Sequence, residues 1–294
     1  MEVSVIIVNY NTCQMTSECI DSIYEQTKDV SFEIILIDNA STDGSKTHFE
    51  KDERIRYVYS YENMGFGRAN NVGMMLARGE YLFLLNSDTL LVNNAIKLFY
   101  EYAKGHDEKA FYGCWLEDKE GRSTLSAENM ITVGGLLKKV FGFYWKGIRR
   151  QEYSFNHLED GCKKVGYVTG ADMFFHRGIY ELTGGFDHVF FMYYEEVDWQ
   201  LRASKLGVAS YLINGPRIIH LCGASQIKQS VFNPNKFRIM FKSEYYYVKK
   251  NYNRFQYLVF RLLNPILYIP IFLFARSASI KTALPCIKAV IVGR

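Results

Sequence analysis

The chain has 294 residues, a hydrophobic content of 48%, a charged content of 22% and a formal net charge of +4 at pH 7. This composition excludes an extensively disordered protein, and the small net charge gives no indication of nucleic-acid binding. Because the chain exceeds the usual length of a single domain, we expect one large domain followed by an appendage.

The cysteines and the N-terminus bear on the cellular compartment. Six cysteines are scattered along the chain without a C-x-x-C pair, which argues against a zinc site and against a disulfide framework. The chain enters an apolar run at residues 3–8 with no basic segment or small-residue cleavage site before it. We therefore expect a cytoplasmic protein, and the C-terminal sequence described below suggests the inner face of the cell membrane.

Apolar runs alternate with helix-like segments in the first third of the chain. This alternation predicts an α/β fold with a mostly parallel central sheet flanked by helices. No G-x-G-x-x-G motif follows the first run, which disfavours a dinucleotide-binding domain. Strands are predicted at residues 3–8, 32–37, 55–59 and 81–85, and helices at residues 16–25, 67–77 and 93–103.

The middle of the chain divides into an irregular and a regular part. Between about residues 116 and 164 the periodicity is weak, which predicts loops that cover the sheet and contact a variable substrate. Further elements are predicted as strands at 165–176, helices at 177–182 and 197–206, and two short strands at 209–212 and 218–220.

The C-terminal region is basic and aromatic, and residues 258–275 are almost wholly apolar. Arg261, Asn264, Pro265 and Pro270 interrupt that run, so an amphipathic segment on a membrane surface is favoured over a transmembrane helix. The alternative is ordinary packing of C-terminal helices on the preceding domain. We predict a domain at residues 1–233 and a helical, basic-aromatic region at residues 234–294 that associates peripherally with membranes.

The apolar run at residues 81–85 ends abruptly in Asn86-Ser87-Asp88. Ligands of open α/β sheets bind at the carboxyl ends of strands, where a carboxylate and an amide oxygen can hold Mg²⁺ or Mn²⁺ beside a diphosphate. A plain strand-to-turn junction is the alternative. His220 closes another predicted strand and is a candidate second metal ligand, provided that the fold brings it near Asp88.

Asp38 ends the second predicted strand and can accept a hydrogen bond from a pyrimidine base or a ribose hydroxyl. The following Ser41, Thr42 and Asp43 are read as helix caps. The segment at residues 62–73 places glycines at a tight turn before a helix, and its backbone and Asn side chains can line a nucleotide pocket.

Glu195, Glu196 and Asp198 stand at the beginning of a predicted helix, behind an aromatic segment. These acidic residues can have a purely structural role, because the helix dipole stabilises acidic residues in a first turn and Asp198 and Arg202 form an ordinary i,i+4 pair. In the functional reading, one adjacent glutamate deprotonates an acceptor hydroxyl and the other orients it, while crowding of the two charges raises one pKa.

Together these motifs resemble glycosyltransferase family 2, which has the GT-A nucleotide-diphospho-sugar transferase fold, and most closely its rhamnosyltransferase-like members. The resemblance runs from Val3 to about Ser225, and four motifs appear in the family's order. They are VIIVNYN at 5–11, DNASTDGS at 38–45, NMGFGRANNVG at 63–73 and NSD at 86–88. Two positions depart from the family pattern: Asn86 replaces the first Asp of D-x-D, and Glu196 replaces the Asp of a Glu-Asp pair.

The resemblance implies an inverting, metal-dependent transfer of a sugar from a dTDP- or UDP-sugar donor to a glycan or lipid-linked acceptor. It assigns the catalytic base to Glu196 beside Glu195, and a Mg or Mn ion to Asp88 and His220. It assigns the donor site to Asn9, Asn11, Asp38, Asn63, Gly67, Asn70, Asn86, Ser87 and Asp88, and sugar contacts to Asp172 and Trp199. A nucleotidyltransferase on a similar fold and a non-catalytic glycan-binding scaffold are the alternatives.

Overall fold

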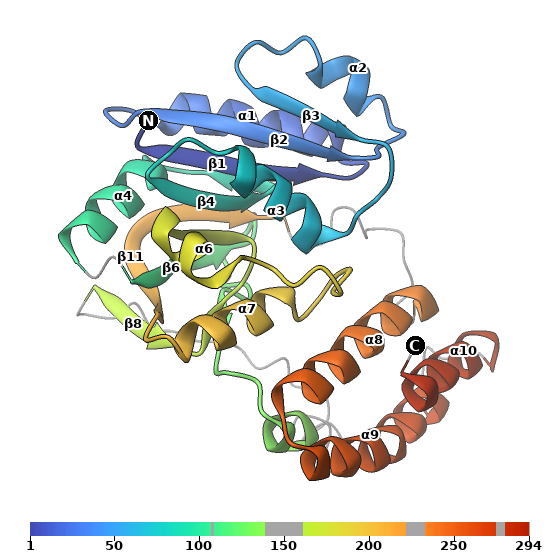
Figure 1. Ribbon diagram of the computed structural model, residues 1–294. Coiled ribbons are helices and arrows are strands. Elements are labelled where there is room, and N and C mark those ends of the chain that lie inside the picture. The colour runs from blue at the N-terminus through green and yellow to red at the C-terminus, as the bar shows by residue number, and fades with distance from the viewer. Residues whose placement is uncertain (107–108, 139–160, 222–232, 275–279, 294) are drawn as a thin grey trace.

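The computed structural model describes residues 1–106, 109–138, 161–221, 233–274 and 280–293. Within these ranges the chain folds into one central sheet with helices on both faces and a helical C-terminal region (Figure 1). The strands are β1 (Val3–Asn9), β2 (Phe32–Asn39), β3 (Arg56–Ser60), β4 (Tyr81–Asn86), β5 (Thr89–Leu91), β6 (Ala110–Glu117), β7 (Ala127–Glu128), β8 (Cys162–Val165), β9 (Tyr167–Val168), β10 (Asp172–His176) and β11 (Ala209–His220). The helices are α1 (Cys13–Gln26), α2 (Ser45–Phe49), α3 (Phe66–Leu76), α4 (Ala95–Gly105), α6 (Arg177–Thr183), α7 (Glu195–Ser204), α8 (Pro234–Asn251), α9 (Arg254–Phe274) and α10 (Ile280–Val292).

Nine of these strands form the central sheet, in the order β3-β2-β1-β4-β10-β6-β11-β5 with β8 paired to β11. The four N-terminal strands are mutually parallel, as expected for βαβ units. Beyond β4 the sheet is mixed, because β10 is antiparallel to both β4 and β6. The predicted α/β class is confirmed, and a second parallel pair, β6 with β11, lies beyond β10.

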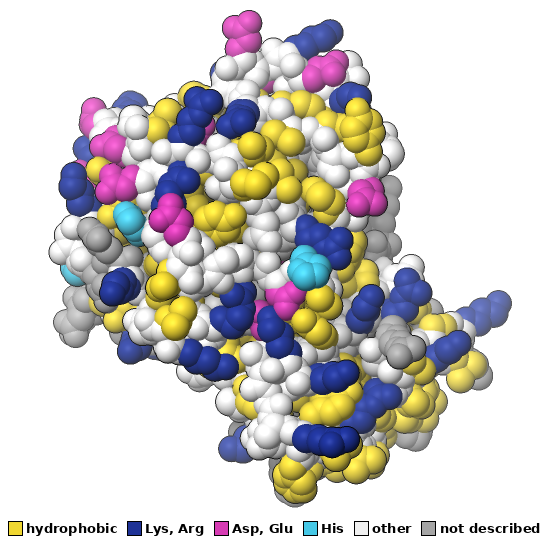
Figure 2. Space-filling view, in the orientation of Figure 1, with side chains coloured by type: hydrophobic (Ala, Val, Ile, Leu, Met, Phe, Trp, Pro, Cys, Tyr) yellow, Lys and Arg dark blue, Asp and Glu magenta, His cyan; other side chains and the backbone are white. Residues whose placement is uncertain are grey.

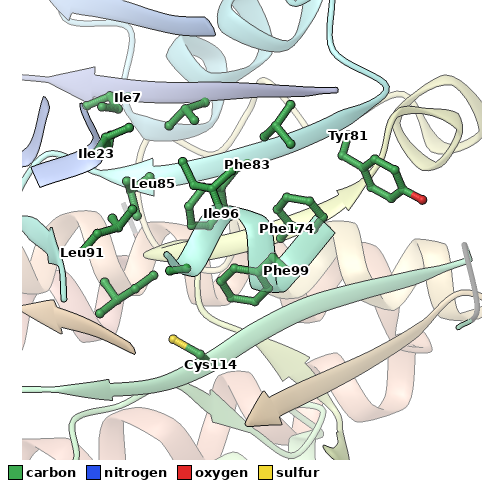
Figure 3. Close-up of a cluster of buried hydrophobic side chains, with 14 of the residues drawn as sticks. Ile7, Ile23, Tyr81, Phe83, Leu85, Leu91, Ile96, Phe99, Cys114 and Phe174 are labelled. Carbon is green, nitrogen blue, oxygen red and sulfur yellow. The ribbon is translucent and has the colours of Figure 1, made fainter. Parts of the chain in front are cut away.

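Side chains of alternating strand residues pack under helices on the two faces of the sheet. On one face, Val5 and Ile7 of β1 pack with Ile20 and Ile23 of α1. Figure 3 shows the aromatic part of this cluster, in which the ring centroid of Phe99 lies 5.4 Å from that of Phe83 and 5.3 Å from that of Phe174. On the other face, Ile6 of β1 packs into a cluster with residues of α3, α6 and α7. Burial of both faces fixes the strand register and therefore the place where each strand ends.

The C-terminal helices lie together at one end of the molecule, beyond α7 (Figure 1). Their core contains Phe241 and Val248 of α8 together with Phe190 and Val197 of the preceding part of the chain. The described part of the region forms three helices, and its shared core fits the alternative of C-terminal helices packed on the preceding domain rather than the favoured membrane-surface segment. The boundary at residue 233 stays a prediction.

Helix α9 runs through Pro265 and Pro270, which the sequence analysis treats as interruptions. Each internal proline removes one backbone hydrogen bond and costs about 3 kcal/mol. Burial of Phe260, Leu267 and Phe272 along the helix offsets this cost. Among the helices that the structure describes, none combines the length and apolar character needed to cross a membrane.

Several strands differ from expectation. The two short strands predicted near residues 209–220 are one strand, β11, whose register shifts between Ile213 and Ile218. Gly215, at φ 111°, and the following Pro216 lie in this irregularity and break the alternation that a continuous strand would show. Strand β5 and strand β6, which lies between β10 and β11, were not predicted. The segment predicted as loops at about residues 116–164 contains β7 and most of β8, and residues 139–160 of it lie outside the described residues.

Candidate active site

The carboxyl ends of β1, β2 and β4 lie in register at one edge of the sheet. Asn9 pairs with Asp38 across β1 and β2, and Val8 pairs with Asn86 across β1 and β4. Because these strands are parallel, the polar residues that end them collect at one edge, where ligands of such sheets bind. The structure therefore brings together residues predicted from three separate motifs.

Asn9 organises this edge from a fully buried position. Its Oδ1 accepts hydrogen bonds from the hydroxyls of Thr12 (2.7 Å) and Thr16 (3.1 Å), and its Nδ2 donates to the hydroxyl of Ser41 (3.1 Å). The hydroxyls of Thr12 and Ser87 lie 3.0 Å apart. Asn9 and Ser87 thus hold the three strand ends in fixed relative positions through contacts within the protein.

Asp38 is fully buried, and both of its carboxylate oxygens accept hydrogen bonds. The backbone N–H of Ser41 donates to Oδ1 (2.9 Å), and the hydroxyl of Tyr57 donates to Oδ2 (2.6 Å). Burial, followed by the hydrogen bond to Asp38, raises the pKa of Tyr57 well above its ordinary value. Asp38 has no exposed surface in this structure, so its predicted contact with a base or ribose stays a prediction.

The turn at residues 63–67 connects the strand ends to α7. Asn63 Oδ1 accepts the backbone N–H of Gly65 at 2.9 Å. Gly65 has φ 84°, and a Cβ there would lie 2.1 Å from the carbonyl oxygen of Phe191, so only glycine fits. A Cβ on Gly67 would lie 3.5 Å from Cβ of Glu195. Gly65 therefore allows the start of α3 to pack closely on Phe191, and Gly67 packs on Phe186 beside Glu195.

The two remaining asparagines of the predicted donor site differ in accessibility. Asn11 is exposed, at φ 55°, and its Oδ1 accepts the backbone N–H of Thr42 at 2.7 Å. Asn70 is buried, and its Nδ2 donates to the carbonyl of Phe66 at 3.1 Å. Asn11 is thus available at the surface of the site, whereas Asn70 stabilises the first turn of α3.

Asp88 and His220 are brought together by the antiparallel pairing of β5 and β11, in which His220 lies opposite Thr89. His220 Nε2 lies 3.3 Å from Asp88 Oδ1, and 3.5 Å from Asn86 Nδ2. The Asp88 and His220 side chains are 14% and 16% exposed, so a ligand can reach both. Their separation suits two ligands of one divalent ion. Within the described residues, no third His, Cys, Asp or Glu joins them to form a larger cluster.

Glu195 and Glu196 begin α7 directly after Tyr193 and Tyr194, which both have φ 69°. Positive φ at a non-glycine residue costs of order 1 kcal/mol and occurs preferentially at functional sites. Each glutamate has a buried Oε2 without a hydrogen-bond partner among the described residues. Such orphaned oxygens are costly in a folded protein, and they are positioned to accept a proton or a ligand hydroxyl.

The pKa values of both glutamates are raised. For Glu195 the main cause is burial, and the charge of Glu196 adds to it. Burial also raises the pKa of Glu196 to about 6, with a further contribution from the charge of Glu128. A carboxylate with a pKa near 6 is a stronger base than an ordinary glutamate and is still largely ionised at neutral pH.

Asp172 begins β10 opposite Leu85 of β4 and is fully buried. Its Oδ2 accepts the backbone N–H of Cys114 at 2.6 Å, and its Oδ1 has no partner among the described residues. Burial raises the pKa of Asp172 to about 7, against smaller opposing effects of Cys114 and His220. Asp172 therefore lies within electrostatic reach of His220, but it presents no exposed surface to a sugar.

Trp199 lies in the core. Its ring is fully buried and packs against Phe111, Phe175 and Phe186, and its indole N–H donates to the hydroxyl of Thr183 at 2.6 Å. This placement argues against the predicted sugar contact, because a side chain with no exposed surface presents no ring face to a ligand. The family resemblance suggested Trp199 as a site residue, but the residue lies on the buried face of α7.

A family model described as "Glycosyl transferase family 2" matches residues 4–181, which is more than half of the 294-residue chain. The chain belongs to glycosyl transferase family 2. The matched segment contains the predicted motifs at the ends of β1, β2 and β4, while the glutamates of α7 and His220 lie beyond it.

Curated relatives of this family 2 glycosyltransferase are similar over part of their length. The chain is 32% identical over 115 residues to glycosyltransferase GlyG of Streptococcus pneumoniae, covering 38% of each protein. It is 25% identical over 201 residues to the N-acetylglucosaminyl-diphospho-decaprenol L-rhamnosyltransferase of Mycobacterium tuberculosis, covering 64% of this chain and 66% of that protein. The chain thus spans about two fifths to two thirds of the length of these relatives.

Solved structures share the fold. The crystal structure of Staphylococcus aureus TarS superposes with a TM-score of 0.53 at 14% identity, covering 94% of this chain and 44% of TarS. That of GalNAc-T7 with UDP, GalNAc and Mn²⁺ superposes with a TM-score of 0.64 at 14% identity, covering 98% of this chain and 54% of that one. The glycosyltransferase therefore has the GT-A fold.

Two residues at the site of this glycosyltransferase were missed by the sequence analysis. Tyr57 donates to Asp38, and its position in the predicted strand at 55–59, next to the Asp38 strand, was an available signal. Glu128 of β7 contributes to the raised pKa of Glu196. It stands in the segment of weak periodicity, where no pattern could have singled it out.

Proposed function

We propose that this glycosyltransferase moves a sugar from a UDP- or dTDP-sugar to a hydroxyl of a cell-surface glycan or lipid-linked acceptor, with inversion at the anomeric carbon. The observation that carries the proposal is the glutamate pair at the start of α7, in which both pKa values are raised and each Oε2 is buried without a hydrogen-bond partner among the described residues. The polar strand ends supply the second part of the site. A chain of contacts joins the two parts: Asn39 at the end of β2 donates to Asn63 at 3.0 Å, and Gly67 lies against Glu195.

The donor occupies the edge formed by β1, β2 and β4. Asp38 accepts from the base or ribose, Asn11 lies at the exposed side of this pocket, and the diphosphate reaches towards Asp88 and His220. Those two side chains converge closely enough to hold one Mg²⁺ or Mn²⁺ ion, so the residues present fit the cation that the family implies. The bound cation would neutralise the charge on the departing diphosphate.

The acceptor hydroxyl is activated at the start of α7. Glu196 removes its proton, the acceptor oxygen forms a bond to the anomeric carbon, and the bond from that carbon to the diphosphate oxygen breaks. The diphosphate leaves with the electron pair, and the proton stays on Glu196. A single displacement inverts the anomeric configuration. Glu195, the more buried of the two carboxylates, holds the acceptor in position.

Rhamnose is our first choice of donor sugar, because the matched mycobacterial relative is named as an L-rhamnosyltransferase. The lipid-linked acceptor follows from the same printed name, which contains a diphospho-decaprenol. Peripheral binding at the inner face of the cell membrane would bring such an acceptor within reach. An exposed apolar stripe on α9 supports it, formed by Phe255, Leu258, Leu262, Ile266 and Leu273.

A donor panel tests this function. The purified chain is incubated with UDP- and dTDP-sugars, including dTDP-rhamnose, in Mg²⁺ or Mn²⁺, and release of the nucleoside diphosphate is measured with and without lipid-linked acceptors. We expect one donor to be consumed, an inverted product by NMR, and loss of activity on chelation of the metal. The Glu196→Gln variant is the matched control for contaminating hydrolases. A product that retains the donor's configuration, or activity unaffected by chelator, would contradict the proposal.

A further inference from the structure

A groove with a volume of about 1300 Å³ lies between α8, the ends of α9 and α10, and the loop at residues 189–191. We refer to it as the basic groove because five cationic side chains line it and none of its described lining residues is acidic. The cations are Arg238, Lys242 and Lys249 from α8, Arg261 from α9 and Lys288 from α10. Figure 2 shows Lys and Arg side chains gathered over these helices, with hydrophobic side chains between them.

The cations of the basic groove lack carboxylate partners in the part of the chain that the structure describes. Arg238 and Lys242 are four residues apart on α8, a spacing at which like charges destabilise a helix. Lys250 on the same helix, in contrast, forms ion pairs with two carboxylates: its Nζ lies 2.6 Å from Asp187 Oδ2 and 2.8 Å from Asp198 Oδ2. The protein thus neutralises one cation of α8 with two carboxylates and leaves its neighbours in the groove unbalanced.

The basic groove adjoins the segment that leads into the glutamate pair. Phe190 and Phe191 form part of its wall, and Glu195 follows four residues after Phe191. The Phe191 carbonyl accepts the backbone N–H of Phe66 at 2.9 Å, and Phe66 belongs to the turn at residues 63–67 in the predicted donor site. Ser243 of α8 fixes the same segment by donating to the carbonyl of Met192 at 2.7 Å. The loop therefore has the basic groove on one side and the predicted donor site on the other.

We propose that the basic groove binds the diphosphate of the lipid-linked acceptor, so that the acceptor sugar extends past Phe191 towards Glu196. This proposal rests on the proposed function and adds the place where the acceptor is held. Several converging cations without acidic neighbours match a compact, multiply charged anion. An acidic protein segment is less suitable, because it would present its charges one at a time along an extended chain.

The surroundings of the groove favour a lipid as the source of that diphosphate. Tyr257 and Arg261 of α9 line the groove, and Leu258 and Leu262, each one position further along the helix, are 50% and 68% exposed. An apolar stripe therefore runs beside the cationic lining. A lipid diphosphate needs both surfaces, because its charged group and its hydrocarbon chain are joined directly.

A vesicle-binding experiment with the full chain tests the proposal. Cosedimentation is measured with phosphatidylcholine vesicles that contain a polyprenyl diphosphate, and with vesicles of equal surface charge that contain phosphatidylglycerol instead. We expect wild type to prefer the diphosphate vesicles, and the Lys242→Gln/Lys249→Gln variant to bind them at least about tenfold less tightly. The control variant Lys51→Gln/Lys205→Gln removes two exposed charges from the large domain and should bind as wild type does. Melting temperatures establish that each variant is folded.

Three outcomes would overturn the assignment. Equal binding to both kinds of charged vesicle would indicate a general anionic surface. Unchanged binding by the Lys242→Gln/Lys249→Gln variant would place the diphosphate elsewhere. Thermal stabilisation by inorganic pyrophosphate without any preference for the lipid would indicate a soluble anion. The assay contains no donor, so it is independent of turnover: wild type that binds the diphosphate vesicles but consumes no nucleotide sugar would contradict the proposed function and support the groove.

Discussion

At the ends of β1, β2 and β4 the polar side chains are bonded to one another, whereas the cations of the basic groove have no carboxylate partners among the described residues. Asn9 and Asp38 are fully buried, and both polar atoms of each side chain form hydrogen bonds within the protein. In the groove, the guanidinium of Arg261 lies 4.8 Å from the ring centroid of Tyr245. The first region is organised before any ligand arrives, and the second lacks the charge that a ligand would supply.

This difference has an energetic meaning. A buried polar group that lacks a partner costs about 1–3 kcal/mol, so the network at the strand ends stabilises the fold and fixes the geometry of the site together. Exposed cations remain hydrated and cost much less, so the groove can keep unbalanced charge. Variants at the two regions should therefore separate effects on chemistry, on stability and on membrane binding.

The largest effect is expected for Asp88→Ala, which removes the carboxylate from the predicted metal pair. Transfer should fall by roughly 10³-fold or more, because the charge of the leaving diphosphate is no longer neutralised. The melting temperature should change little, since Asp88 lies at a strand end and outside the core clusters. Asp21→Ala, at a side chain that is 48% exposed on α1, is the control. Activity near the wild-type level in saturating metal would show that Asp88 is not required.

The glutamate pair should give the next largest effect. Glu196→Gln keeps the shape of the side chain and loses its basicity, so transfer should fall by about 10² to 10⁴-fold while donor binding survives. Because the base must be ionised, wild-type kcat/KM should fall as the pH drops through about 6, the pKa of Glu196. Glu195→Gln should raise the acceptor KM more than it lowers kcat. If Glu195→Gln is inactive with intact donor binding and Glu196→Gln is active, the two roles are reversed.

Two neighbouring lysines on α8, Lys249 and Lys250, allow the paired and the groove cations to be compared by the free energy of unfolding. Lys250→Met leaves Asp187 and Asp198 without their shared cation and should lower the free energy of unfolding by about 2 kcal/mol. Lys249→Met removes an exposed groove cation that has no carboxylate partner among the residues the structure describes, and it should leave the free energy of unfolding unchanged or slightly higher. Chemical denaturation of both variants measures the difference. Equal losses of unfolding free energy in the two variants would contradict the view that Lys250 is balanced by carboxylates and Lys249 is not.

The pH dependence of this difference has a definite sign. Burial raises the pKa of Asp187, but hydrogen bonds led by that from Lys250 outweigh it and hold the pKa at about 2. A carboxylate whose pKa is lower in the folded than in the unfolded state stabilises the fold at pH values above its unfolded-state pKa, which is about 3.9 for Asp. The advantage of wild type over Lys250→Met should therefore be full above about pH 5 and shrink as the pH falls towards 2. A difference that is constant across this range would exclude Asp187 as its source.

The smallest effect is expected at the apolar edge of the basic groove. Leu262→Gln on α9 should weaken binding to phosphatidylcholine vesicles that carry the polyprenyl diphosphate by up to about tenfold, because one exposed apolar side chain is lost. Leu182→Gln on α6, where the leucine is 55% exposed, is the matched control. Cosedimentation reports both. Equal weakening by the two substitutions would argue against a specific membrane-facing side.

Local sequence patterns were sufficient for the N-terminal half of the fold. The strands β1 to β4 were predicted within a few residues, because each is a short apolar run bounded by polar residues. The same boundaries located Asp38 and Asp88, since a parallel strand must end where its apolar run ends. Strand β6 was not predicted although its sequence is also an apolar run, AFYGCWLE, so the local signal was present. Its place between β10 and β11 depends on strands that come later in the chain.

The sequence by itself determined the α/β class, the polar strand ends and the motifs that carry the family resemblance, because these depend on residues close together in the chain. Tertiary structure alone decided which residues far apart in the chain come into contact. It brought His220 to 3.3 Å from Asp88 through the pairing of β5 with β11, and it enclosed Trp199 in the core. It also assembled the cations of three helices into one groove. Such long-range contacts depend on the packing of whole elements, whose sequence separations no local periodicity records.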